Sequence, residues 1–129
     1  MVRHFVPIEE VLRYIDVLEM FKLNRFHWHL SDDQGWRIEI KALPGLVEKG
    51  SFRRGSIIGH LNEGKGEDGV PVSGYFTQDE VRRVVAYAAE RGITVIPEID
   101  LPGHMLAALT AYPELGCSGW PYEVWTRWG

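Results

Sequence analysis

Apolar residues recur at helical spacing in two stretches of the chain. The first stretch runs from Pro7, which suits the first turn of a helix, to about Lys22. The second begins at Thr77, which has capping-box spacing to Glu80, and Gly92 suits its C-terminal end. The apolar faces of these two predicted helices consist of Ile8, Val11, Leu12, Ile15 and Leu18, and of Val81, Val84, Val85, Ala88 and Ala89.

Three shorter stretches have the character of strands. From Asn24 to Leu30, apolar residues alternate with histidine and arginine, which predicts a strand with one polar face. The run from Ile93 to Ile99 is almost continuously apolar, so we expect it to be buried on both faces, as in a parallel sheet. Pro97 cannot donate a ladder hydrogen bond, and we therefore expect a bulge near that end. Residues 1–6 are predicted to be the tail of another strand, residues 31–36 a loop, and residues 105–112 a helix.

The alternation of strands and helices predicts an α/β fold with parallel βα units. A doubly wound sheet and a barrel both fit this order. No glycine-rich phosphate-binding turn follows either clear strand, which disfavours a nucleotide-binding sheet.

Composition narrows the classes of function. The 129 residues are 45% hydrophobic and 25% charged, as in an ordinary globular protein, and their number is about half that of a typical α/β barrel. The net charge is −4 and no basic run occurs, so we expect no nucleic-acid partner. We expect no membrane span either, because no apolar run reaches about 18 residues. The single cysteine, Cys117, excludes an intrachain disulfide.

Polar side chains cluster where each predicted strand ends. They lie at residues 3–4, 29–33 and 98–104, and the carboxyl ends of parallel strands meet at one rim. The adjacent carboxylates Asp32 and Asp33 cannot both point the same way, so we expect one to face the site and the other to hold the loop through backbone N–H groups. A carboxylate beside His104 would raise the pKa of that imidazole. The alternative for all three residues is a purely structural role in loops.

His27 and His29 share one strand face, and His-x-His is also a zinc spacing. Asp32 or His104 could complete such a site, so a metal-dependent barrel hydrolase is an alternative. It would need two more ligand-bearing strands, and the five tryptophans favour a carbohydrate ligand instead. We therefore expect neither a metal nor a cofactor.

Four stretches of the sequence resemble, in order, the signatures of family 20 glycoside hydrolases, the β-N-acetylhexosaminidases. The most specific is the run His-Trp-His-Leu-Ser-Asp-Asp-Gln-Gly-Trp. The resemblance covers essentially the whole chain, and its four stretches are residues 3–5, 24–37, 74–77 and 97–104.

The resemblance implies a partial (β/α)8 TIM barrel, in which residues 1–129 form a single fragment that holds only the first few βα units. It implies removal of terminal N-acetylglucosamine or N-acetylgalactosamine with retention, the sugar's own acetamido oxygen attacking the anomeric carbon. In this family an Asp orients the acetamido group and the adjacent Glu protonates the leaving oxygen. Their His-x-Gly-Gly-Asp-Glu type motif is absent here, so we expect the isolated chain to be inactive.

The resemblance carries over to individual residues. Arg3 matches the arginine that binds hydroxyls of the terminal sugar, and Asp32 and His104 match the pair that supports the catalytic acid. His27, Asp33 and Trp36 are predicted to build the pocket floor. Two or three strands cannot close a barrel, so we also expect self-association through exposed sheet edges. A non-catalytic carbohydrate-binding protein is the remaining alternative.

Overall fold

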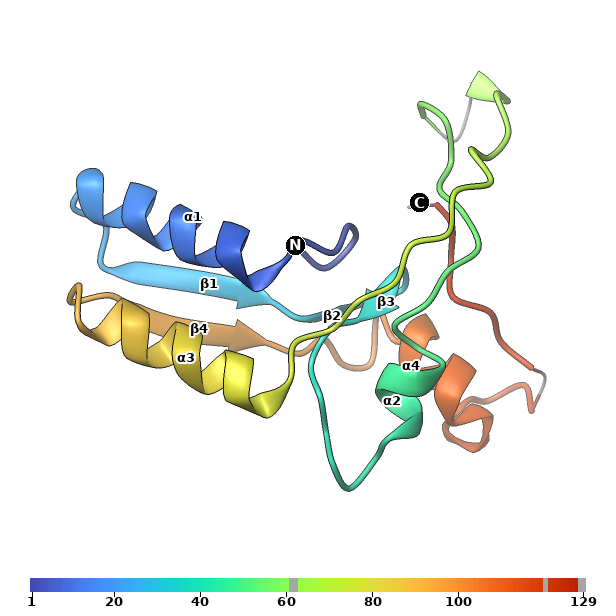
Figure 1. Cartoon of the computed structure of the whole chain (residues 1–129). Coiled ribbons are helices and arrows are strands. Elements are labelled where there is room, and N and C mark those ends of the chain that lie inside the picture. The colour runs from blue at the N-terminus through green and yellow to red at the C-terminus, as the bar shows by residue number, and fades with distance from the viewer. Residues whose placement is uncertain (61–62, 120, 128–129) are drawn as a thin grey trace.

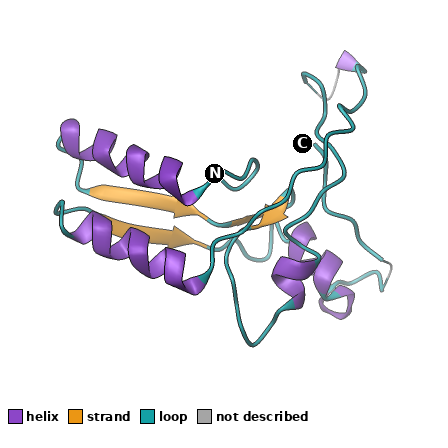
Figure 2. Cartoon of the chain, in the orientation of Figure 1, coloured by secondary structure: helices purple, strands orange, loops and turns teal. Residues whose placement is uncertain are grey.

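The computed structural model describes residues 1–60, 63–119 and 121–127. Two long helices, α1 (Ile8–Met20) and α3 (Gln78–Ala89), lie along two parallel strands, β1 (Arg25–His29) and β4 (Thr94–Glu98), as Figure 1 shows. The strands pair in one continuous register from Arg25 opposite Thr94 to His29 opposite Glu98. Figure 2 separates this α/β layer pair from the loops and short elements beyond the strand ends. The predicted α/β class with parallel strands is thus observed.

One face of the two-stranded sheet carries the main core. Phe26 and Trp28 point from β1 toward the helices and are 3% and 1% exposed. Both helices pack against this face, which leaves the face bearing His27 much less covered, with its side chain 66% exposed. The buried members of this core are Ile8, Val11, Leu12, Ile15, Leu18, Phe26, Trp28, Leu30, Phe76, Val84, Ala88 and Ile93.

Two predictions for β4 are wrong. The strand is not buried on both faces, and Ile96 is 44% exposed, because in the described chain nothing packs on the face away from the helices. There is no bulge at Pro97, which lies opposite Trp28 in the uninterrupted ladder. The amide of Thr94 and the carbonyl of Glu98 bond toward β1, so the intervening Pro97 nitrogen points away from it. Its missing N–H therefore costs no ladder bond.

The helix ends follow the sequence signals. The Glu80 amide donates to Thr77 Oγ1 at 3.2 Å, and the Thr77 amide donates to Glu80 Oε2 at 2.7 Å, which completes the predicted capping box. Gly92, just beyond α3, has a φ of +67°, a conformation that glycine adopts without steric cost. Helix α1 begins directly after Pro7.

The structure differs from the sequence prediction on both sides of β1. Residues 1–6 form no strand, and the carbonyls of Val2 and Arg3 are bound by arginine side chains instead of by a ladder. The predicted loop at 31–36 is a small antiparallel hairpin of β2 (Ser31–Asp32) and β3 (Gly35–Trp36). This hairpin redirects the chain at the carboxyl end of β1 and holds Asp32 in a fixed backbone.

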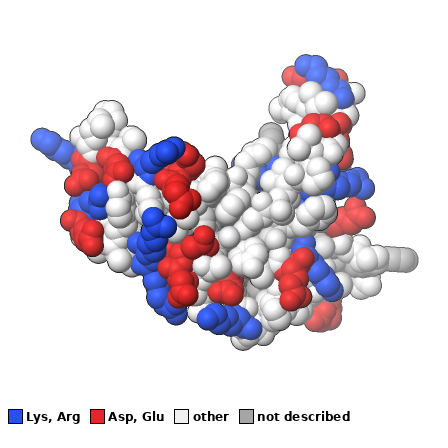
Figure 3. Space-filling view, in the orientation of Figure 1, with Lys and Arg blue, Asp and Glu red and all other residues white. Residues whose placement is uncertain are grey.

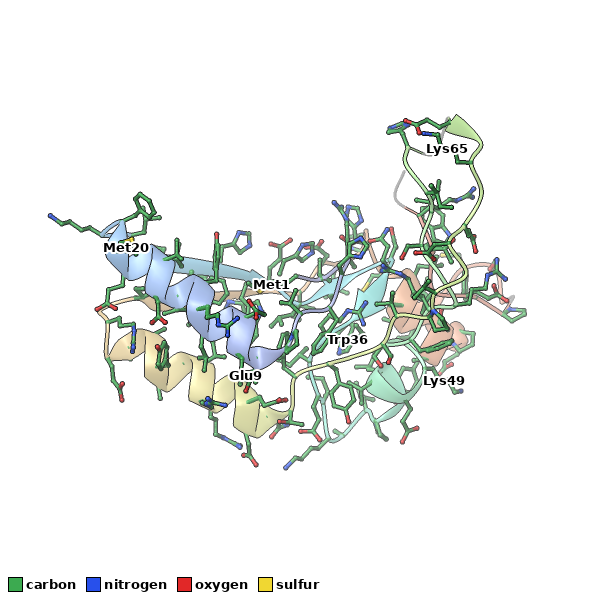
Figure 4. All side chains as sticks on the ribbon, turned by 45° about the horizontal axis from the view of Figure 1, so that its top comes forward. Met1, Glu9, Met20, Trp36, Lys49 and Lys65 are labelled. Carbon is green, nitrogen blue, oxygen red and sulfur yellow. The ribbon has the colours of Figure 1, made fainter. Side chains whose placement is uncertain are left out.

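A second, smaller core lies beyond the hairpin. Helix α2 (Gly45–Glu48), helix α4 (Leu106–Ala111) and the 3-10 turn Pro113–Leu115 surround it, and α4 confirms the helix predicted at 105–112. Trp36 is labelled beside this region in Figure 4, and Lys65 lies at the tip of a segment that projects from the body. The buried members are Trp36, Leu46, Val47, Ala107, Ala108, Ala111 and Val124.

On the face drawn in Figure 3, acidic and basic side chains are interspersed over α1, α3 and the projecting segment. Among the helices of the described residues, none combines the length and the apolar character that a membrane span requires.

Candidate functional site

Arg3, Asp32 and His104 meet beyond the carboxyl ends of β1 and β4. Asp32 Oδ2 accepts a hydrogen bond from Arg3 Nε at 3.0 Å, and Asp32 Oδ1 lies 3.0 Å from His104 Nδ1. The Asp32 side chain is fully buried, whereas those of Arg3 and His104 are 47% and 48% exposed. A buried anion therefore holds two half-exposed groups that face solvent, one a permanent cation and the other a proton carrier.

The two adjacent aspartates divide their tasks as the sequence suggested. The Asp33 amide donates to Asp32 Oδ1 at 2.7 Å, and Asp33 Oδ1 accepts from the Leu106 amide at the start of α4 at 3.0 Å. Asp33 Oδ2 lies 3.3 Å from His104 Nδ1. Asp33 thus joins the hairpin to the loop that carries His104. Its predicted contact with substrate stays a prediction.

His104 sits in the loop between β4 and α4 with a φ of +55°, which is uncommon for a residue with a side chain. The charge of Asp32 raises the pKa of His104 above its ordinary value of 6.5, and Asp33 adds to the effect. The structure therefore favours the imidazolium form, and with it an ion pair to Asp32.

This shift predicts a pH-dependent stability. Because the folded pKa of His104 lies above its unfolded value of 6.5, the contribution is complete below that pH and disappears as the pH rises through the folded pKa. We expect the stability that the native chain has over His104→Gln to decrease as the pH rises above 6.5. Urea unfolding of both proteins across this range measures the effect, and a pH-independent difference would contradict it.

His29, at the end of β1, lies between Asp32 and acidic residues of β4 and of the loop that follows β4. Its Nε2 lies 3.2 Å from Asp100 Oδ2, 3.3 Å from Glu98 Oε1 and 3.9 Å from Asp32 Oδ2. His27 pairs with the other oxygen of Glu98, one step further from the rim. We assigned no role to Glu98 or Asp100 from the sequence, although their alternate spacing at the end of β4 is the signal that points to one face of the sheet.

Two groups of side chains bring three ligand atoms within 4.8 Å of one another: His29 with Glu98 and Asp100, and His104 with Asp32 and Asp33. His27 belongs to neither group, whereas the zinc alternative requires it as a ligand. The oxygens of Asp32, Asp33 and Glu98 already have protein partners. We assign neither group as a metal centre.

Trp36 lies in the second core. Its indole N–H donates to the Ile38 carbonyl at 2.7 Å, and the side chain is 7% exposed among α2 and α4 residues. The structure does not bring it into the group formed by Arg3, Asp32 and His104. A role of Trp36 in sugar binding stays a prediction.

Known proteins match the chain over its whole length. The model of glycosyl hydrolase family 20, catalytic domain, matches residues 1–129. A beta-hexosaminidase from Porphyromonas gingivalis is 50% identical over 127 residues, which cover 98% of this chain and 15% of the relative.

Solved structures agree in fold. A beta-N-acetylhexosaminidase crystal structure matches with a TM-score of 0.90 at 42% identity, covering 99% of this chain and 26% of that one. An exo beta-N-acetylglucosaminidase from Vibrio harveyi, in complex with N-acetylglucosamine, matches with a TM-score of 0.75 at 47% identity over 88% of this chain and 18% of that one. This chain therefore spans about a quarter or less of the relatives it matches. The resemblance noted in the sequence is confirmed: the chain belongs to glycosyl hydrolase family 20 and matches its catalytic domain.

Proposed function

We propose that the protein containing this chain hydrolyses terminal N-acetylhexosamine residues with retention, by the substrate-assisted mechanism of its family. The observation that carries the proposal is the contact of Arg3 and His104 with the two oxygens of one buried carboxylate, Asp32. A guanidinium and an imidazole at a common rim offer a hydroxyl-binding fork beside a group that can hold a proton.

Each side chain has a distinct task in this proposal. Arg3, which is half exposed, binds neighbouring hydroxyls of the terminal sugar while Asp32 fixes its orientation. Asp32 also stabilises the protonated form of His104, and His104 in turn tunes the charge of the catalytic acid. Asp33 keeps His104 in place through the start of α4, and His27, Asp33 and Trp36 are the further candidates for the substrate pocket.

The acid itself is assigned to a segment outside residues 1–129. The sequence has one adjacent Asp-Glu pair, Asp79 and Glu80, but Glu80 is engaged in capping α3 and Asp79 pairs with Arg82. Neither lies near the rim residues in sequence or element. We therefore expect no glycosidase activity from residues 1–129 alone.

The experiment compares the intact protein with the 129-residue chain on an aryl N-acetylglucosaminide and an aryl N-acetylgalactosaminide. We expect release of the phenol only from the intact protein, because a missing general acid alone costs about 10²- to 10⁴-fold in rate. Inactivity of the intact protein on both substrates, or strong activity of the isolated chain, would refute the proposal. Binding of N-acetylglucosamine without hydrolysis would favour a carbohydrate-binding protein.

We further propose that β1 and β4 are two strands of a (β/α)8 barrel, with the face that bears His27, His29 and Ile96 turned to its interior. The exposure of Ile96 and of the outer edge of β4 supports this arrangement.

It follows that residues 1–129 expressed alone should self-associate through these surfaces. Light scattering over a range of concentrations should show a mass above that of one chain. A compact, cooperatively melting monomer would count against this prediction.

A further inference from the structure

Two buried arginines contact the backbone around Arg3. Arg37 and Arg53 are 0% and 1% exposed, and neither takes part in the ion pairs of the rim. Within the described residues, the Arg37 guanidinium donates to four backbone carbonyls: Nε to Val2 at 2.9 Å, Nη1 to Ser51 at 2.6 Å and to Gly74 at 2.9 Å, and Nη2 to Gln34 at 3.1 Å.

Arg53 makes a similar set of contacts. Its Nη1 donates to the carbonyl of Arg3 and, at 3.3 Å, to that of Gln34. Its Nη2 donates to Ser56 Oγ at 2.8 Å and lies 3.1 Å from His4 Nδ1. The two arginines therefore bind the same hairpin carbonyl and neighbouring carbonyls of the N-terminal segment.

These contacts fix the backbone on both sides of Arg3. The Val2 carbonyl belongs to the peptide unit before the Arg3 Cα, and the Arg3 carbonyl belongs to the unit after it. Holding both units sets the direction in which the Arg3 side chain leaves the backbone. No strand ladder does this, because residues 1–6 pair with neither β1 nor β4.

Burying the charged side chains of Arg37 and Arg53 costs folding free energy, and their presence despite this cost indicates a specific role. Burial, with the nearby charge of Arg53, lowers the pKa of Arg37 to about 10. Apolar residues often fill a buried site at a lower cost in stability than charged ones. The chain also keeps Gly35 beside Arg37, since a Cβ at Gly35 would lie 2.2 Å from the Arg37 Cζ.

We propose that Arg53 and Arg37 are positioning residues: by holding the peptide units on either side of Arg3, they direct its guanidinium onto Asp32 and toward the sugar. Only the sugar-binding part rests on the proposed function. Neither residue was assigned a role from the sequence, because most of their acceptors are backbone carbonyls, which carry no sequence signal.

The test is Arg53→Lys in the intact protein. Lysine keeps the positive charge but lacks the planar fork that reaches several acceptors at once. We expect KM for an aryl N-acetylhexosaminide to rise about 3- to 10-fold with little change in kcat, as for loss of uniform binding. We also expect the pKa of His104, followed by NMR with isotope-labelled histidine, to rise as the Arg3 cation moves away from Asp32. Arg54→Lys is the matched control, because the neighbouring Arg54 is 68% exposed and should change neither quantity.

Arg3→Gln completes a double-mutant cycle. If Arg53 acts through Arg3, the double variant is no worse than Arg3→Gln alone, whereas additive effects on KM would overturn the proposal. A His104 pKa that rises in Arg3→Gln but not in Arg53→Lys would overturn it too. An intact protein without activity would refute the proposed function but leave the His104 titration as a test of positioning.

If Arg53→Lys does not fold, Ser56→Ala, which removes one acceptor of Arg53, should raise the His104 pKa slightly, and an unchanged pKa would count against the proposal.

Discussion

Asp32→Asn should lower kcat/KM of the intact protein for an aryl N-acetylhexosaminide by about 10²- to 10³-fold. Asparagine is nearly isosteric, but it removes the charge that holds both Arg3 and His104. The pKa of His104 should then fall toward its ordinary value, because the Asp32 charge is the largest cause of its elevation. Steady-state kinetics and the histidine NMR titration measure the two effects separately.

The matched control for this variant is Asp79→Asn. It makes the same chemical change in a carboxylate that is 89% exposed on α3, so activity and the His104 titration should both stay at the native level. If Asp32→Asn also kept native kinetics, Asp32 would have no part in catalysis. An unchanged His104 pKa in Asp32→Asn would show that the ion pair does not form in solution.

Of the substitutions proposed for this protein, Arg37→Met should lower the free energy of unfolding the most. Removing the buried charge relieves a cost of about 3 kcal/mol, which comes first from desolvation and then from the charge of Arg53, as the pKa lowered from 12.5 to about 10 implies. The carbonyls of Val2, Ser51 and Gly74, however, lose their donor, at about 1–3 kcal/mol each, while the Gln34 carbonyl keeps its bond from Arg53. The loss is larger than the relief, so we expect the free energy of unfolding to fall by about 2–5 kcal/mol. Urea unfolding followed by tryptophan fluorescence measures it.

Gly35→Ala should destabilise in the same direction without touching the arginine itself, because the added Cβ displaces the Arg37 guanidinium. Arg13→Met is the control: Arg13 is 73% exposed on α1 and pairs with the exposed Glu10, so a change below about 1 kcal/mol is expected. Equal unfolding midpoints for Arg37→Met and Arg13→Met would mean that the buried carbonyls find other donors, and Arg37 would lose its structural importance.

Local patterns in the sequence account for the regular elements. The spacing of Ile8 to Leu18, the pairing of Thr77 with Glu80 and the alternation in β1 each depend on residues a few positions apart, so a linear sequence displays them. The same reasoning placed Asp32 and His104 at one rim, because parallel strands bring their carboxyl ends together. Arg3 also lies there, but residues 1–6 form no strand, so strand ends do not explain its position. It also anticipated that one of two adjacent aspartates would hold a loop, as Asp33 does with α4.

Predictions failed where an outcome depended on a distant partner. The coverage of β4 depends on what packs against its second face, and the tolerance of Pro97 depends on which edge of β4 is paired. Residues 1–6 have strand-like composition, yet their carbonyls bond to side chains from positions 37 and 53.

The sequence alone therefore determined helices α1, α3 and α4, the parallel strands β1 and β4, the family and most of the polar residues at the rim. Only the tertiary structure decided how these residues are held: Asp32 between Arg3 and His104, Glu98 between His27 and His29, and Arg37 and Arg53 on backbone carbonyls. The physical reason is that side-chain periodicity records which face of an element is buried. A backbone carbonyl, by contrast, is the same in every residue, so only folding shows which arginine binds it.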